Sequence, residues 1–349
     1  MAEKQKVQES VIHSVLALYG LDTAFCEQRE YITYNREHGD NLVKIILSVL
    51  LENGKRVVVK ILHEQDDLLK DRAKIEKQSA FSEFMRQTGI RTPKRYMANG
   101  RYCNEYIYND LPCNVTVEDW CGDEIMEINT DIAYKIGELM ARMHILSLEN
   151  KCEIGCNTLF SAVYRNDVDA FPDFCEIGKN ENLDQTIIEQ IKKLHDEKLD
   201  TIRAIWERLP MAAVQGDISI NNLVYKEDEL VVFDYNNAGD EVLISDLVLE
   251  GLLTAYEMDL PEGTDQSYRE RLFPALLNGY LSIRKLNEEE ANTAWIVYTL
   301  YHSLWFSKVV YNDDSLEKLV EKEDYAAANR LLKQMLADMT EADDGRFQK

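Results

Sequence analysis

The sequence predicts an α+β protein of two lobes, a small β-rich lobe with one helix followed by a larger, mainly helical lobe that holds a short hairpin. With 349 residues the chain exceeds the usual domain of about 100–200 residues. Strand-like runs rich in Val, Ile and Tyr dominate before about residue 120, and apolar residues recur at helical spacing after residue 130. These observations together indicate the two lobes and their order.

The small lobe contains three runs typical of strands. They are residues 42–51, 56–62 and 101–109. The first two are joined through Asn53-Gly54, a pair that favours a tight hairpin turn. A helix is expected over residues 70–88, because apolar residues there follow three- and four-residue steps. It should end at Gly89, with Pro93 shortly beyond.

The second lobe is expected to be helical except for one strand pair. The helices are expected near residues 130–143, 183–208, 243–257, 268–283 and 288–337. The strand pair spans Asn222–Asp234, with a turn of three residues, Glu227–Glu229. If this hairpin is symmetric about Asp228, Asn222 and Asp234 face each other, about 4.5–5.5 Å apart.

The composition excludes some partners. Lys and Arg number 39 against 63 Asp and Glu, so the formal net charge is −24. Such an acidic surface repels phosphate backbones and anionic membranes, so we expect neither nucleic-acid nor membrane binding. The 7 cysteines are irregularly spaced, and the N-terminus carries no apolar leader, so we expect a cytoplasmic protein with reduced thiols. A metalloprotein or hydrolase built on Cys152 and Cys156 lacks an ordered motif.

Three residues suggest phosphoryl transfer. Asp217 and Asn222 have the D-x4-N spacing of a catalytic loop, in which the Asp takes the proton of the attacking hydroxyl and the Asn binds Mg²⁺. Asp234 follows the apolar run 231–233 and would add a carboxylate to the same cation, since Mg²⁺ prefers oxygen ligands.

Lys60 ends the apolar run 57–59, which suits a lysine that binds nucleotide phosphates from a strand. Such a lysine needs a carboxylate partner on the next helix. Glu76 is the first candidate and Glu83 the second.

The chain resembles the aminoglycoside phosphotransferase and choline kinase-like family, the small-molecule branch of the protein-kinase-like fold, over roughly residues 20–310. Four segments carry the resemblance: Gln215-Gly216-Asp217 with Asn222, the run VVFDYNNAGD around Asp234, the helix segment Gly137–His144, and the link Thr88–Pro93. Two positions depart from the family pattern: Gln215 replaces a His, and Gln78 falls where the family has its lysine-pairing Glu.

The resemblance implies a nucleotide-binding lobe over residues 1–117, a hinge over 118–122 and a catalytic lobe over 123–349. It implies Mg²⁺ and ATP or GTP as cofactors, with Asp217 catalytic, Lys60 at the phosphates, and Asn222 and Asp234 at the metal. Glu118 and Trp120 of the hinge would contact the base through their backbone. Gly39 would belong to the turn that covers the nucleotide.

The predicted activity is phosphorylation of a hydroxyl on a small molecule, either aminoglycoside-like or an amino alcohol. The alternative is a catalytically inactive, kinase-like binding or structural protein. Asp246, Glu250 and Glu257 share one helix face, which is either a solvated acidic face or a wall that binds a cationic substrate. A protein kinase is disfavoured, because D-F-G and A-P-E motifs are missing. We expect a monomer or weak dimer.

Overall fold

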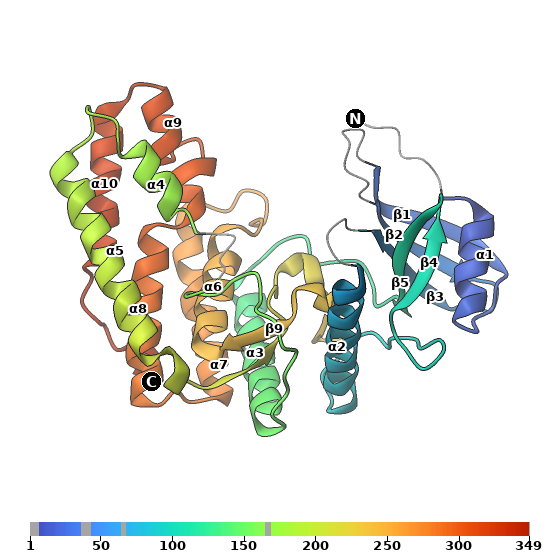
Figure 1. Ribbon diagram of the computed structural model, residues 1–349. Helices are drawn as coiled ribbons and strands as arrows, with labels where there is room; N and C mark the ends of the chain where they lie inside the picture. The colour runs from blue at the N-terminus through green and yellow to red at the C-terminus, as the bar shows by residue number, and fades with distance from the viewer. Residues whose placement is uncertain (1–6, 36–42, 64–67, 165–168, 349) are drawn as a thin grey trace. The chain divides into compact units, whose positions relative to one another are not determined.

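The computed structural model describes residues 7–35, 43–63, 68–164 and 169–348 (Figure 1). The chain divides into two compact units. The first comprises Met1–Asp123 with Val224–Asn236, and the second comprises Glu124–Leu223 with Asn237–Lys349. The hairpin that the sequence assigned to the helical lobe therefore belongs to the first unit.

A five-stranded antiparallel sheet forms the centre of the first unit, with its strands in the order β1-β2-β3-β5-β4. The strands are β1 Phe25–Asn35, β2 Val43–Leu51, β3 Arg56–His63, β4 Asn104–Tyr108 and β5 Leu111–Asp119. The strands predicted near 42–51, 56–62 and 101–109 are confirmed as β2, β3 and β4. Sequence reasoning missed β1 and β5, whose charged and polar residues hide the apolar pattern.

One face of this sheet packs against α1, Glu9–Leu18, which lies beside the strands in Figure 1. Val15 and Leu16 of α1 share a buried cluster with Val57, Val59 and Ile61 of β3. Because side chains alternate along a strand, Lys60 points away from this cluster. The predicted helix 70–88 is confirmed as α2, Leu68–Gln87, and ends before Gly89.

The predicted strand pair is confirmed as β7, Leu223–Lys226, and β8, Glu229–Val232. The turn contains two residues, Glu227 and Asp228, whose φ angles of 55° and 62° are those of a tight I′ turn. A two-residue turn shifts the pairing by one position from the expected three-residue turn. The predicted opposition of Asn222 and Asp234 across the hairpin is therefore wrong.

The second unit is mainly helical. Its helices are α3 Thr130–Glu149, α4 Phe171–Ile177, α5 Gln185–Ile205, α6 Leu243–Tyr256, α7 Leu272–Ile283, α8 Glu288–Ser303, α9 Leu316–Glu321 and α10 Tyr325–Met339. Short turns of helix are η1 Trp206–Arg208, η2 Ile220–Asn222, η3 Tyr235–Asn237 (at the junction of the units), η4 Gln266–Arg271, η5 Ser307–Tyr311 and η6 Arg346–Gln348. Two strands, β6 Met211–Val214 and β9 Gly239–Val242, pair antiparallel. The single helical stretch expected over 288–337 is thus broken into α8, α9 and α10.

Two glycines allow α3 and α7 to touch through their backbones. A Cβ atom at Gly137 would lie 1.9 Å from the carbonyl oxygen of Leu276, and one at Gly279 would lie 1.9 Å from that of Tyr134. No side chain fits at either position. Gly137, which contributes to the family resemblance, therefore serves helix packing.

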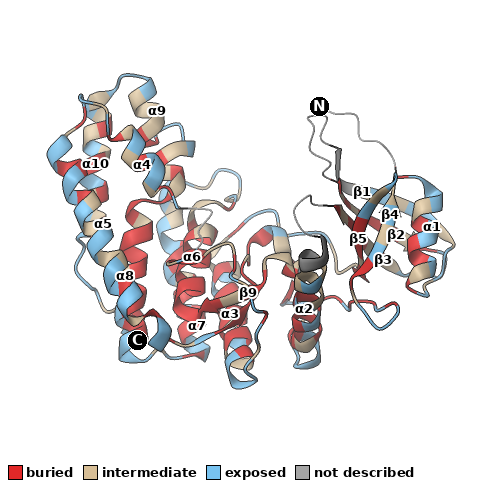
Figure 2. Cartoon of the chain, viewed as in Figure 1, coloured by how far each residue is buried: buried red, intermediate tan, exposed pale blue. Residues whose placement is uncertain are grey.

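The core of the second unit is centred on α6 and α8. Figure 2 shows buried residues along both helices, whereas α5 turns a largely exposed face outward. The predicted α+β class, with a small β-rich part and a larger helical part, is confirmed. Within the described ranges, no helix combines the length and apolarity that crossing a membrane requires.

Candidate active site

Lys60 lies at the centre of a buried group of charges in the first unit. Its side chain is 4% exposed and forms ion pairs with Glu118 at 3.2 Å and with Asp234 at 3.3 Å. Glu118 lies on β5 opposite Val58 of β3, so it shares a sheet face with Lys60. Its second oxygen lies 3.2 Å from the guanidinium of Arg95. Two cations and two carboxylates thus neutralise one another, and Asp234, whose side chain is 26% exposed, is the member that reaches solvent.

Asp234 lies two residues beyond the end of β8 and has a φ of 53°, a left-handed conformation that non-glycine residues adopt rarely. Its Oδ1 accepts a hydrogen bond from the backbone N–H of Asn236 at 3.3 Å. Burial alone would raise the pKa of Asp234, but the charges of Lys60 and Arg95 outweigh it and lower the pKa. The carboxylate is therefore held ionised, as a cation ligand must be.

The same balance keeps Lys60 charged. Burial alone would lower the pKa of Lys60, but the charges of Asp234 and Glu118 outweigh burial and raise it. A buried lysine that stays protonated carries a full positive charge in a poorly solvated place, where it attracts an anionic group strongly.

The helix α2 does not supply the partner that the sequence predicted for Lys60. The carboxylate of Glu76 accepts hydrogen bonds from the backbone N–H groups of Tyr102 and Cys103, both at 2.9 Å, and so fixes the start of β4. Glu83 pairs instead with Arg86 on the next turn of the helix. The prediction that Glu76 or Glu83 holds Lys60 is wrong, because strand β5 supplies a carboxylate on the lysine's own sheet face.

Gln78 and the expected hinge residues also find partners in the first unit. The side-chain amide of Gln78 donates to the carbonyl oxygen of Asn236 at 2.7 Å, two residues beyond Asp234. The backbone N–H of Trp120 donates to the carbonyl oxygen of Arg56 at 3.0 Å. Gly39 lies outside the described residues.

The loop with the D-x4-N spacing lies in the second unit between two paired strands. Val214 at the end of β6 is opposite Gly239 at the start of β9, so both ends of the intervening segment are held together. The backbone N–H of Asp217 donates to Oε1 of Gln215 at 2.8 Å. Gln215, which replaces the histidine of the family pattern, therefore supports the loop with a hydrogen bond of its own.

Gly216 is required by the shape of this loop. Its φ of 74° is left-handed, and a Cβ atom there would lie 2.7 Å from the carbonyl oxygen of Asn237 and 2.8 Å from Thr158. Any side chain would push the loop away from Asn237 and Thr158. The Gln-Gly-Asp sequence is thus explained by local packing as well as by chemistry.

Two asparagines hold Asp217. The side-chain amide of Asn237 donates to the carboxylate Oδ2 of Asp217 at 3.0 Å. The amide of Asn222 donates to the backbone carbonyl oxygen of Asp217 at 2.9 Å. The structure therefore brings Asp217 and Asn222 together, as predicted from their spacing. Sequence reasoning missed Asn237, although it stands only three residues after Asp234.

The acidic residues of α6 are not a solvent-facing wall. Asp246 is buried and its carboxylate accepts a hydrogen bond from Nε2 of His144 at 2.9 Å. Glu250 is fully buried, and burial together with the charges of Asp246 and Asp217 raises its pKa. The predicted acidic face, whether solvated or substrate-binding, is therefore wrong for these two residues.

Glu257 differs from the other two acids because it is half-buried at the end of α6. Its Oε1 accepts a hydrogen bond from the indole N–H of Trp305 at 2.6 Å. A carboxylate beside an aromatic ring can stabilise an organic cation. Glu257 therefore remains a candidate for substrate binding.

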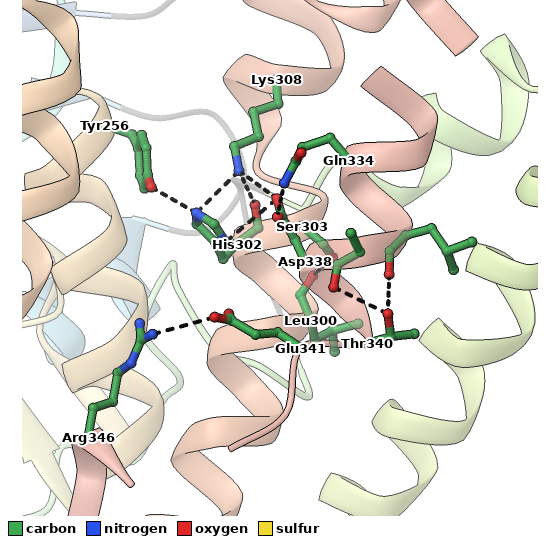
Figure 3. Close-up of polar contacts among 12 residues, drawn as sticks. Tyr256, Leu300, His302, Ser303, Lys308, Gln334, Asp338, Thr340, Glu341 and Arg346 are labelled. Carbon is green, nitrogen blue, oxygen red and sulfur yellow. Dashed lines mark hydrogen bonds and ion pairs between the residues drawn. The ribbon is translucent and has the colours of Figure 1, made fainter. Parts of the chain in front are cut away.

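A polar cavity of about 920 Å³ lies among the C-terminal helices of the second unit. Figure 3 shows Lys308 and Gln334 converging on Asp338, and Tyr256 reaching His302. Burial, with the charges of Lys308 and Arg346, lowers the pKa of His302 to about 3. A neutral His302 accepts at Nε2 from the Tyr256 hydroxyl at 2.8 Å, while Nδ1 faces Asp338 at 3.9 Å. The network links α6, α8 and α10 around a histidine without charge.

Two of the candidate metal ligands, one in each unit, have the oxygen chemistry that Mg²⁺ prefers. Asp234 offers an ionised carboxylate, and the hydrogen bond that Asn222 donates leaves its amide oxygen for a cation. Within the described part of the chain, no group of three or more His, Cys, Asp and Glu side chains could hold a metal. Mg²⁺ needs few protein ligands, because it commonly takes its other ligands from substrate phosphates and water.

No model of a protein family matches the sequence, and no curated protein matches it. Solved structures do match the fold along nearly the whole chain. An amicoumacin kinase in complex with AMP-PNP and Ca²⁺ has a TM-score of 0.59 at 16% identity, covering 97% of this chain and 96% of that one. The chain has the fold of small-molecule kinases. A microcompartment-associated aminopropanol kinase follows with a TM-score of 0.59 at 15% identity, covering 96% and 99% of the two chains.

An aminoglycoside phosphotransferase from Alicyclobacillus acidocaldarius has a TM-score of 0.57 at 12% identity, covering 97% of this chain and 96% of that one. These similarities agree with the family resemblance drawn from the Gln215–Asn222 loop and the Asp234 strand. At such identities they establish the fold of this chain and no more.

Proposed function

We propose that this protein transfers the terminal phosphoryl group of ATP, or of GTP, to a hydroxyl group of a small molecule with the help of Mg²⁺. The observation that carries the proposal is the ion pair between the buried Lys60 and the partly exposed Asp234, at 3.3 Å. A charged lysine and an ionised aspartate together suit a nucleotide whose phosphates carry a divalent cation.

In this proposal Lys60 binds the phosphates, and Asp234 and Asn222 are the protein ligands of Mg²⁺. The cation would neutralise negative charge that develops on the transferred group. The restraints on these side chains support their roles, because Lys60 and Asp234 are held by buried charges and Asn222 by its bond to the Asp217 carbonyl.

Asp217 is proposed as the residue that orients the acceptor hydroxyl and takes its proton. Its carboxylate is held by Asn237, which stands three residues after Asp234 along the chain. Three peptide units span at most about 11 Å between the Cα atoms of Asp234 and Asn237.

The acceptor is proposed to be a small molecule that bears an amino group. The formal net charge of −24 favours cationic ligands. The carboxylate of Glu257 beside the Trp305 indole would suit an ammonium group. Similar structures are named for amicoumacin, aminopropanol and aminoglycosides.

The test is a screen for ADP or GDP release, with ATP or GTP and Mg²⁺, over a panel of amino sugars, amino alcohols and nucleosides. The wild-type chain should phosphorylate at least one class of acceptor. D217N should lose turnover by about 10²–10⁴-fold, the range for removal of a general base, while it keeps its affinity for nucleotide. Absence of any nucleotide binding at millimolar concentration would refute the proposal and favour a non-catalytic role.

A further inference from the structure

The lysine proposed to bind phosphates has its anionic partner on a strand instead of a helix. We propose that Glu118 of β5 is the positioning residue for Lys60, in place of Glu76 or Glu83 on helix α2. The proposal rests on the proposed function, because it assigns a role within the same nucleotide site. In protein kinases the corresponding partner is a glutamate on the helix that follows the lysine strand.

The sheet itself fixes the geometry of the pair. Lys60 of β3 lies opposite Thr116 of β5, and Glu118 is two residues further along β5, so both side chains leave the same face of paired strands. The ion pair spans 3.2 Å, and both side chains are less than a tenth exposed. The backbone of neither residue can shift without disturbing the ladder of hydrogen bonds between β3 and β5.

Arg95 holds the other side of the Glu118 carboxylate. Its guanidinium lies 3.2 Å from Glu118 Oε2 and also donates to the hydroxyl of Ser79 at 2.9 Å. The backbone around Arg95 pairs with the other edge of β5, since the N–H of Tyr96 donates to the carbonyl oxygen of Val117 at 2.9 Å. The Glu118 carboxylate is therefore clamped between two buried cations.

The two carboxylates that pair with Lys60, Asp234 and Glu118, have different roles in this proposal. If Asp234 turns to a cation, Lys60 loses the charge of one partner while it remains buried. A buried charge without a partner is strongly unfavourable, so a second carboxylate is needed to hold the Lys60 ammonium group in place. Glu118 meets this need, whereas Glu76 and Glu83 are engaged with the β4 backbone and with Arg86. The anionic partner of Lys60 then comes from the sheet, and Glu76 and Glu83 of α2 are not needed for it.

The test compares the affinity of the full chain for MgATP with its affinity for adenosine, which lacks phosphates, by isothermal titration calorimetry. E118Q keeps the shape of the side chain and removes its charge. We expect it to weaken MgATP binding by about tenfold or more, the loss typical of a hydrogen bond to a charged group, with adenosine affinity changed less than about twofold. A loss confined to the ligand with phosphates is not expected from a merely structural defect.

Variants E76Q and E83Q test the alternative that a carboxylate of α2 positions Lys60. This test can be made even if E118Q does not fold. Both variants should keep the wild-type ratio of MgATP affinity to adenosine affinity. The control variant E105Q should keep it too, because the side chain of Glu105 is 57% exposed beside Arg72. A lower ratio in E76Q or E83Q would overturn the proposal. So would an E118Q protein with wild-type affinity for both ligands, or with equal losses for both. A wild-type chain that binds neither ligand would instead refute the proposed function itself.

Discussion

Replacement of Glu241 by Gln is expected to make the free energy of unfolding less sensitive to rising pH. Glu241 lies on β9 opposite Ala212 of β6 and is 1% exposed. Its Oε1 accepts the backbone N–H of Val242 at 2.9 Å. Burial is the main reason that the pKa of Glu241 rises from its ordinary value of 4.5 to about 8. The folded chain therefore retains a proton on this carboxyl at neutral pH.

The sign of the effect follows from this raised pKa. Below pH 4.5 the carboxyl of Glu241 is protonated in both the folded and the unfolded chain, and folding gains its full stability. As the pH rises from 4.5 to about 8, the unfolded chain releases a proton that the folded chain keeps. The free energy of unfolding then falls by up to about 1.4 kcal/mol for each pH unit, or up to about 5 kcal/mol over the whole window.

The measurement is urea-induced unfolding at several pH values, followed by tryptophan fluorescence. Trp206, Trp295 and Trp305 all lie in the second unit and report on it. The difference in unfolding free energy between E241Q and the wild-type chain should change by up to about 3 kcal/mol between pH 5 and pH 7, in favour of the variant at high pH. E207Q, at an exposed position, should parallel the wild type. Parallel pH profiles for E241Q and the wild type would show that the reasoning about Glu241 is wrong.

Two further predictions concern His302 and Asn237. The pKa of His302 is lowered to about 3 in the folded chain, so its stabilising effect is present above pH 6.5 and is lost as the pH falls from 6.5 toward 3. H302Q should flatten this acid-side decline in unfolding free energy by up to about 1.4 kcal/mol per pH unit, and an unchanged slope would contradict the assignment. N237A removes the hydrogen bond that orients the carboxylate of Asp217, so turnover should fall by about ten- to a hundredfold with nucleotide affinity retained. Steady-state kinetics of N237A on an acceptor found in the screen would test this prediction. A kcat equal to that of the wild type would exclude this role for Asn237.

The local sequence was sufficient to predict most of the elements around the candidate site. Apolar alternation identified β2 and β3, and the Asn-Gly pair identified the turn between them. The D-x4-N spacing correctly brought Asp217 and Asn222 together, because five residues of chain keep them close. Strand β5 escaped prediction, since Pro112 and polar residues interrupt its pattern. The hairpin was found, but its register depends on a turn one residue shorter than expected.

The sequence by itself determines the order of the candidate site residues along the chain, which is Lys60, Asp217, Asn222 and Asp234. The expected chemistry follows from that order. The sequence does not determine the partners of these residues, because they come from strands and loops far away in the chain. Only the pairing of β3 with β5 decided that Glu118, and neither Glu76 nor Glu83, holds Lys60. Likewise, only the pairing of β6 with β9 brought Asn237 to Asp217. Charged side chains select whichever opposite charge the backbone brings within about 4 Å, and that proximity is a property of the folded chain.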